Sequence, residues 1–376
     1  MLTRRHLLLG TAMTAMLPAQ IAAARKAPGA APAGAAAPAT AKPELPLGEL
    51  LGKAHSWGYQ LQNYDFATLA ASEADVLVVD YSISGDDPAR LSESTVRKLQ
   101  RKPDGGRRIV LAYLSIGEAE EYRFYWKKDW IETDDSAEGA AVAKTKATAG
   151  QPTTSGKGAI LPPASDAATK PARWLSPSAP PWLGDENESW SGNFAVKYWE
   201  PDWQALIVGA PGCYVDRIVA AGFDGVYLDR VDAFYEYTDQ RPTAPEDMIA
   251  FVRRIADHAR AKRAGFLVVP QNGEELLTRP DYVATIDAIA KEDLLYGSPE
   301  QSKPNSMGQI SNTIGWLSHA RLAGRPVLVV EYIDDKSEIE KVRRQVSNLG
   351  YIATFGPRML DGLSPEAVPP KPPRAE

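Results

Sequence analysis

The sequence predicts an α/β fold, a closed (β/α)8 TIM barrel with a long insertion, flanked by tryptophans, after its third strand. Eight apolar, β-branched runs recur along the chain, and polar segments with helical periodicity separate most of them. Strands that alternate with helices pair in parallel. The 319 residues from 47 to 365, less the 49 of a biased stretch at 133–181, leave 270. A barrel of this type needs about 250 residues.

The elements follow in order along the chain. We expect strands at 57–62, 76–80, 109–115, 225–229, 265–270, 284–290, 326–331 and 351–355. Helices are expected at about 92–101, 211–221, 245–263, 306–323 and 336–348. An open doubly wound sheet is the alternative, but it would need a glycine-rich phosphate turn after the first strand, and the sequence contains no GxGxxG motif.

Both ends of the chain differ from the barrel in composition. Residues 1–24 contain Arg4 and Arg5 followed by an apolar stretch, which predicts a twin-arginine-like export signal. Its cleavage would leave no membrane association, whereas an uncleaved anchor is the alternative. Residues 25–46 are rich in Ala and Pro, and 366–376 form a Pro-rich tail, so both predict linkers. The expected location is therefore periplasmic or secreted.

Residues 133–181 form a third biased stretch, rich in Ala, Thr, Ser, Pro, Gly and Lys. We interpret it as a low-complexity loop inserted into the barrel domain 47–365. The reason is that the strand and helix signals on both sides belong to one repeating pattern.

Composition excludes several classes of function. The formal net charge is −6, which gives no support to nucleic-acid binding. Cys213 is the only cysteine, so an intramolecular disulfide and a Cys-only zinc site are impossible. The four histidines form no HExxH motif. We therefore expect no metal and no cofactor, and the sequence gives no signal for the oligomeric state.

Acids and amides follow the strands at the end where barrel enzymes carry their active sites. Paired carboxylates without a phosphate loop, a histidine pair or a reactive thiol indicate glycoside hydrolysis, in which one acid protonates the leaving oxygen and the other attacks carbon or activates water. The residues at these positions are Asp80, Tyr113, Glu118, Asp229, Asp232, Gln271, Asn272, Glu292, Asp293, Glu331 and Tyr332.

Aromatic residues give a second signal for a saccharide. Seven of the nine tryptophans fall between residues 118 and 203, around the insertion. Their flat faces could stack on sugar rings and wall a groove, or they could form a small core that anchors the loop. We favour the groove for Trp182 and Trp190, which lie near glycines, and the small core for Trp199 and Trp203.

Eight short motifs occur in an order that resembles glycoside hydrolase family 114 and its bacterial and archaeal relatives, the endo-α-1,4-polygalactosaminidase-like barrels. They are LSIGEAEEYR at 114–123, WLGDEN at 182–187, WSGN at 190–193, VKYW at 196–199, GFDGVYLD at 222–229, PQNGE at 270–274, KEDL at 291–294 and VEY at 330–332. The resemblance covers about 55–356. Homologues have been labelled cysteinyl-tRNA synthetase-like, but the chain has no HIGH or KMSKS-type signature.

The resemblance implies hydrolysis of an α-1,4-linked, galactosamine-rich exopolysaccharide. Carried over by position, it makes Asp229 the nucleophile and Glu292 the acid/base, although Lys291 stands where the family more often has Asn. The remaining residues that it assigns to substrate binding are Asp80, Tyr113, Glu118, Asp232, Asn272, Glu331 and Tyr332. A cationic amino sugar also fits a carboxylate-rich mouth by charge.

Two other functions remain open. A non-catalytic polysaccharide-binding barrel would use the same acids without cleavage. An esterase or deacetylase would need a metal triad or a Ser–His pair, and the sequence shows neither. The separation of the two carboxylates would distinguish a retaining mechanism (about 5–5.5 Å) from an inverting one (about 6.5–9.5 Å).

Overall fold

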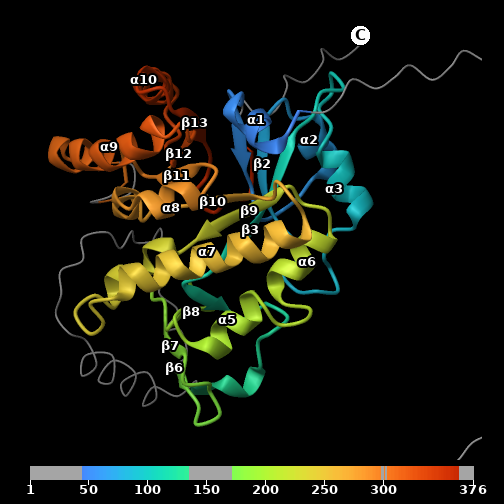
Figure 1. Ribbon diagram of the computed structural model, residues 1–376, viewed down its shortest axis with the longest axis vertical. Helices are drawn as coiled ribbons and strands as arrows, with labels where there is room; N and C mark the ends of the chain where they lie inside the picture. Colours follow the sequence, from blue (N-terminus) through green and yellow to red (C-terminus); the bar gives the residue numbers. More distant parts are fainter. Residues whose placement is uncertain (1–44, 135–171, 298–299, 301–302, 364–376) are drawn as a thin grey trace, which may run out of the picture. The chain divides into compact units, whose positions relative to one another are not determined.

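The computed structural model describes residues 45–134, 172–297, 300 and 303–363. Eight strands of this part form the central sheet (Figure 1). They are β1 (Trp57–Tyr59), β2 (Val76–Asp80), β3 (Ile109–Ser115), β9 (Gly225–Asp229), β10 (Leu267–Pro270), β11 (Ile289–Glu292), β12 (Val327–Glu331) and β13 (Ile352–Phe355).

The strands pair in parallel and follow the order of the chain, as β1–β2–β3–β9–β10 and β11–β12–β13. A backbone hydrogen bond connects the five-stranded and the three-stranded group: the Asn272 N–H, just after β10, donates to the Ala290 carbonyl of β11 at 2.9 Å. At the other seam β13 contacts β1, and the Trp57 indole donates to the Ile352 carbonyl at 2.9 Å. This order confirms the predicted α/β fold, with parallel strands in the order of a TIM barrel.

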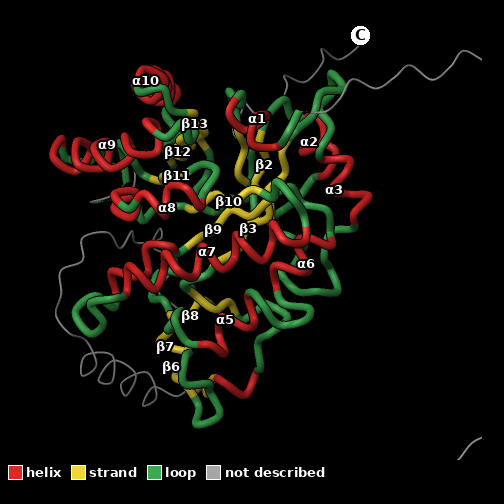
Figure 2. The backbone as a smooth tube through the Cα atoms, in the orientation of Figure 1, coloured by secondary structure: helices red, strands yellow, loops and turns green. Residues whose placement is uncertain are grey.

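Helices surround the strands, as the backbone trace in Figure 2 shows. Serine side chains cap two of them, since Ser92 accepts from the Thr95 amide and Ser306 forms a reciprocal capping box with Gln309. The helices are α1 (Leu47–Gly52), α2 (Phe66–Ala71), α3 (Glu93–Leu99), α5 (Pro201–Ile207), α6 (Tyr214–Ala220), α7 (Ala244–Lys262), α8 (Pro280–Thr285), α9 (Met307–Leu322) and α10 (Lys336–Asn348).

The sixth strand differs from its predicted position. The sequence predicts 284–290, whereas β11 begins at Ile289 and ends at Glu292. The first two predicted residues, 284 and 285, belong to α8, which starts with Pro280 at a position where its missing N–H costs no hydrogen bond, and residues 286–288 connect α8 to the strand. The shift places Glu292 within the strand itself.

The core has two layers on either side of the strands. Side chains that point into the barrel include Tyr59, Val78, Leu111, Tyr227 and Leu328, all of them buried. The opposite faces of the same strands pack against the helices. This alternation places large aromatic rings in the barrel interior, beneath the ends of β9 and β11.

The chain after β3 builds two small antiparallel sheets before it returns to the barrel. One contains β4 (Glu118–Glu120), β8 (Asn193–Val196) and β7 (Leu183–Glu186), and the other pairs β5 (Ile131–Asp134) with β6 (Ala172–Leu175). The strand β6 lies inside the stretch 133–181 that the sequence predicts as loop, so that prediction is too long at its C-terminal side. Residues 135–171 lie outside the described residues.

The tryptophans around this insertion form a small core. The rings of Trp130 and Trp182 lie 5.4 Å apart, and those of Trp182 and Trp203 lie 5.0 Å apart. Trp182 is only 4% exposed, so the prediction that it walls a sugar groove is wrong: neighbouring aromatic rings cover it. The small-core interpretation is confirmed for Trp203, which is fully buried against Trp182, whereas Trp199 packs against the rings of Tyr198 and Tyr237. Trp190 is 36% exposed.

The predicted export signal, the linker up to residue 44 and the C-terminal tail from residue 364 lie outside the described residues. Within the described part, the structure contains no helix whose length and apolar character would let it cross a bilayer.

Candidate active site

Asp229 and Glu292 are the last residues of β9 and β11, on either side of β10. In each case the next residue adopts a left-handed backbone conformation, with φ of 58° at Arg230 and 56° at Asp293. Non-glycine residues rarely adopt this conformation, and clusters of such residues mark functional sites. The turn bends the backbone away at once and leaves both carboxylates at the carboxyl end of the barrel.

Gln271 connects the two carboxylates. Its Nε2 atom donates to Asp229 Oδ1 at 2.8 Å and to Glu292 Oε2 at 2.5 Å. Since both oxygens contact the same nitrogen, they are separated by at most about 5.3 Å, the sum of these two distances. The structure therefore brings together the two residues that the sequence proposes as the catalytic pair.

Asp229 accepts hydrogen bonds on both of its oxygens. The hydroxyl of Tyr113 donates to Oδ2 at 2.7 Å, and the backbone N–H of Arg230 donates to Oδ1 at 2.8 Å. Burial raises the pKa of Asp229 above its ordinary value, while these donors act in the opposite direction by stabilising the charged form. With Gln271, the carboxylate has three uncharged donors, an arrangement suited to an ionised acid.

Glu292 lies in a setting that favours its protonated form. Burial raises its pKa to about 8, and the neighbouring carboxylates of Asp293 and Asp229 add to this rise. Arg358 opposes it only weakly, because its guanidinium pairs with Asp293 at 2.8 Å and lies 3.8 Å from Glu292. Glu292 therefore holds its proton at neutral pH.

Tyrosine rings form the floor beneath the pair. The rings of Tyr59 and Tyr227 lie 5.0 Å apart inside the barrel, and both are buried. Tyr332, at the end of β12, packs under the Arg358 guanidinium at 4.2 Å from its ring centroid. These rings exclude water below the carboxylates, which is the physical cause of the burial effect on their pKa values.

Glu118 and Asp232 lie beside Asp229. Glu118 is buried and pairs with Arg230 at 2.9 Å, and its carboxylate also accepts an N–H from Asn187 at 2.8 Å. Asp232 lies 3.7 Å from the same arginine and is partly exposed. Gly117 permits this approach, because a Cβ atom there would lie 2.3 Å from the Arg230 carbonyl oxygen.

Asp80 belongs to a buried ion network near Asp229. Arg123 contacts Asp80 at 2.8 Å and Glu120 at 2.6 Å, and all three side chains are almost fully buried. The guanidinium also lies 6.0 Å from the ring centroid of Tyr113, the residue that donates to Asp229. Asp80 thus has its strongest partners within the protein.

Two other predicted residues have defined structural contacts. Glu331 is fully buried and accepts the backbone N–H groups of Leu295 at 2.7 Å and Tyr296 at 3.2 Å, and burial raises its pKa to about 8. Asn272 contacts Glu292 directly, with Nδ2 at 3.3 Å from Oε2. Asn272 therefore lies at the site, whereas Glu331 holds the loop after β11.

The sequence analysis did not assign roles to three residues that shape the site: Gln271, Arg123 and Arg358. Gln271 stands next to Asn272 at a strand end, so its position alone could have suggested it. Arg123 and Arg358 lie in loops, and no sequence pattern indicates that they pair with Asp80 and Asp293.

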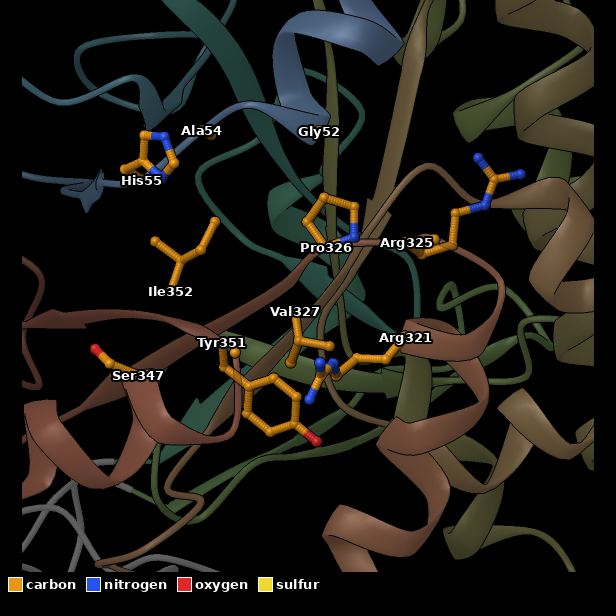
Figure 3. Close-up of a pocket in the computed structure, with 12 residues that line it drawn as sticks. Gly52, Ala54, His55, Arg321, Arg325, Pro326, Val327, Ser347, Tyr351 and Ile352 are labelled. Carbon is orange, nitrogen blue, oxygen red and sulfur yellow. The ribbon is translucent and has the colours of Figure 1, made fainter.

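The cavity shown in Figure 3 lies elsewhere on the barrel. It has a volume of about 430 Å³ and lies at the amino ends of β12 and β13, where Arg321, Pro326 and Tyr351 line it. None of the residues of the candidate active site lines it. In barrels of this kind the amino ends of the strands serve stability and the carboxyl ends serve chemistry.

Potential metal ligands also lie away from the mouth. Within the described ranges, Cys213, Asp216 and His258 bring a thiol, a carboxylate and an imidazole together between α6 and α7. The Asp216 carboxylate already has partners, because His258 lies 2.6 Å and Lys262 3.1 Å from it. These pairs hold the pKa of Asp216 down, at about 2, and link the two helices.

The chain is similar in sequence to a family of glycoside hydrolases and to several uncharacterized proteins. The sequence profile of glycoside-hydrolase family GH114 matches residues 165–366. An uncharacterized protein of Methanocaldococcus jannaschii is 34% identical over 300 residues, which cover 78% of this chain and 70% of that protein. An uncharacterized protein of Deinococcus radiodurans is 31% identical over 343 residues, which cover 90% of this chain and 92% of that protein.

A solved structure shares the fold. The glycoside hydrolase domain of PelA from Pseudomonas aeruginosa aligns with a TM-score of 0.53 at 18% identity, over 84% of this chain and 100% of that domain. The family profile spans β9 to β13 and so includes both carboxylates and Gln271. Given the family match and the relatives that align along most of its length, the chain belongs to glycoside hydrolase family GH114.

Proposed function

We propose that the protein is a retaining glycosidase that cleaves α-1,4-linked, galactosamine-rich polysaccharide, with Asp229 as nucleophile and Glu292 as acid/base. The observation that carries this proposal is the contact of one Gln271 nitrogen with both carboxylates. This contact keeps the two contacting oxygens at most about 5.3 Å apart. Retaining enzymes hold their two carboxyl groups about 5–5.5 Å apart, whereas inverting enzymes leave room for a water molecule.

The protonation states suggest which acid does what. Glu292, with its pKa of about 8, can give a proton to the glycosidic oxygen as the C–O bond breaks. Asp229, with three uncharged donors, can attack the anomeric carbon as a carboxylate. Water then attacks the glycosyl–enzyme ester, Glu292 takes its proton, and Asp229 is released with both residues restored.

Charge supports a cationic substrate. Glu118 and Asp232 share the single guanidinium of Arg230, and Glu274 pairs with Lys291, so acids outnumber cations beside the pair. Ammonium groups of deacetylated galactosamine would complement this charge. A neutral polymer would gain less from it, so we expect activity to rise with the degree of deacetylation.

Exposed aromatic rings support a polymer rather than a small glycoside. Trp190 is 36% exposed, Tyr122 44% and Tyr235 49%, and each belongs to a segment that follows the carboxyl end of β3 or β9. Such rings can stack on successive sugars along a chain. We propose that such rings bind sugars on both sides of the pair, which makes the cleavage internal.

The experiment is incubation of the purified protein with partially deacetylated α-1,4-galactosamine polymer, with product size and new reducing ends followed over time. We expect oligosaccharides whose newly formed reducing ends first have the α configuration, as detected by proton NMR. Initial β products would contradict the retaining mechanism. Binding of the polymer without any cleavage would favour the non-catalytic polysaccharide-binding barrel.

The export signal suggests where the reaction takes place. We propose that Arg4 and Arg5 direct the folded protein out of the cytoplasm, so that the enzyme meets exopolysaccharide in the periplasm or outside the cell.

A further inference from the structure

Gln271 is the residue that both carboxylates share, and every polar atom of its side chain has a partner. Nε2 donates to Asp229 and Glu292, while Oε1 accepts the Tyr227 hydroxyl at 2.7 Å. The side chain is 2% exposed. An amide nitrogen has two hydrogens, so each carboxylate takes one of them.

The orientation of this amide follows from its neighbours. The reverse orientation would place Oε1 against two carboxyl oxygens, which could be tolerated only if both acids were protonated. Burial raises the pKa of Tyr227 well above its ordinary value, so its hydroxyl stays protonated and can donate to Oε1. The amide therefore presents its N–H groups to the pair.

The backbone holds Gln271 between the two strands that carry the acids. Its N–H donates to the Leu228 carbonyl of β9 at 2.8 Å, and the next N–H, of Asn272, donates to the Ala290 carbonyl of β11 at 2.9 Å. Gln271 is thus fixed to Leu228, the residue before Asp229, and its neighbour Asn272 is fixed to Ala290, two residues before Glu292. It can hold a constant geometry between them.

Asn272 distinguishes the two oxygens of Glu292. Its Oδ1 accepts from the Lys291 ammonium at 3.2 Å and from the Glu292 backbone N–H at 3.3 Å, which leaves Nδ2 as the group that faces Oε2. Oε2 therefore faces two amide N–H groups, from Gln271 and Asn272. Among the described residues, none donates a hydrogen bond to Oε1, and the Arg358 guanidinium lies 3.8 Å from it, beyond hydrogen-bond length.

We propose that Gln271, oriented by Tyr227, is a positioning residue that holds Asp229 in its charged form and directs the proton of Glu292 to Oε1. It donates to the charged form of Asp229 and, with Asn272, to Oε2 of Glu292, which places the transferable proton on Oε1. This inference rests on the glycosidase function proposed above.

The proton and electrons balance in this arrangement. The O–H bond of Glu292 Oε1 breaks as its proton moves to the glycosidic oxygen, whose bond to the anomeric carbon breaks while a bond from Asp229 forms. Oε2, with two N–H donors, then shares the charge of the Glu292 carboxylate. In the second step Oε1 recovers a proton from the attacking water.

The test replaces Gln271 by methionine, which has similar length and no N–H donor. Asp229 loses a hydrogen bond that stabilises its charged form, so its pKa should rise. We expect the acidic limb of the pH profile of kcat/KM on the galactosamine polymer to move upward by about 1–2 pH units. Tyr227→Phe keeps the donor but frees the amide, so it should move the limb in the same direction by less.

A second readout does not need activity. A carboxyl whose pKa is higher in the folded than in the unfolded protein loses stability as pH rises between the two values. Removal of the Gln271 donor raises the folded value further. The difference in free energy of unfolding between wild type and Gln271→Met, measured with urea, should therefore grow as pH rises from about 4 to 8.

Gln204→Met is the matched control. This glutamine on α5 also uses both ends of its amide, with Nε2 3.1 Å from the Tyr198 carbonyl and Oε1 2.7 Å from Arg254. It contacts neither catalytic carboxylate. The loss of free energy of unfolding in Gln204→Met should stay constant over the same pH range. The acidic limb of its kcat/KM profile should match that of wild type.

The outcomes separate the two proposals. If the wild type cleaves the polymer and the limb of Gln271→Met coincides with that of wild type, the positioning role is overturned. A stability difference as independent of pH as that of Gln204→Met overturns it as well. If the wild type cleaves no galactosamine polymer and the stability difference still grows with pH, the positioning of the charges stands and the proposed function fails. Should Gln271→Met not fold, Tyr227→Phe serves both measurements.

Discussion

Glu292→Gln tests the acid role most directly, because it removes the transferable proton and changes little else. The new side chain can place its oxygen where Oε2 now accepts N–H groups from Gln271 and Asn272, and its amide nitrogen where Oε1 lies. The fold should therefore persist. With a pKa of about 8, wild-type Glu292 is mostly protonated at pH 7.

The expected loss follows from what the proton does. General acid catalysis contributes about 10²–10⁴-fold, so hydrolysis of the polymer, whose leaving group is a poor one, should fall by that factor. An aryl galactosaminide with a good leaving group needs little protonation, and its first step should fall much less. Asp229→Asn should abolish turnover of both substrates, because every leaving group requires the nucleophile.

The assay compares kcat/KM on the polymer and on the aryl substrate for wild type and both variants. Glu340→Gln, on the exposed surface of α10, is the control and should match wild type on both substrates. Wild-type activity should fall above about pH 8, as Glu292 loses its proton, and at low pH, as Asp229 gains one. An equal loss on both substrates for Glu292→Gln, or near-normal cleavage of the polymer, would refute the acid assignment.

Three further predictions concern the surroundings of the pair. Trp182→Ala should lower the free energy of unfolding by about 3–5 kcal/mol and leave KM unchanged. Trp190→Ala should raise KM for the polymer and leave the melting temperature unchanged. The opposite pattern would show that Trp182, and not Trp190, binds the polymer. Arg123→Met leaves Asp80 and Glu120 buried without their cation and should cost about 3–5 kcal/mol. The loss of free energy of unfolding in this variant, measured with urea, should be larger at pH 8 than at pH 5, because the unpaired acids bind protons more tightly in the folded protein. Equal losses at the two pH values would contradict this prediction. Arg4→Lys combined with Arg5→Lys should retain the protein in the cytoplasm, and unchanged periplasmic yield on fractionation would exclude the twin-arginine route.

The barrel could be predicted from sequence because its signals are local and repeated. Runs such as 76–79 and 109–114 are apolar throughout, since strands of a parallel barrel are covered on both faces. The strand 225–229 has the predicted bounds, and the helix predicted at 245–263 appears as α7 at Ala244–Lys262. The prediction was poorest at β11, where four residues give too short a signal and the preceding α8 has a strand-like composition.

Part of the candidate site could be predicted for the same reason. A residue that ends a strand of a parallel barrel faces the mouth, so strand ends alone suggest Asp229 and Glu292. Residue type does not reveal the partners of a side chain. Thus Trp182 was assigned to a groove although aromatic neighbours cover it, and Glu331 to substrate although two backbone amides bind it.

The sequence by itself determined the barrel, the pair of strands that carries the acids and the family to which the motifs point, because these depend on periodicity and position along the chain. Only the tertiary structure decided which acids are free for chemistry. Asp80 pairs with Arg123, which lies 43 residues away in the sequence, and Asp293 pairs with Arg358, which lies 65 residues away. It also decided that one amide, from Gln271, meets both carboxylates. Electrostatic and hydrogen-bond energies depend on distances of a few ångströms and on burial, and folding sets these quantities between residues that the sequence keeps far apart.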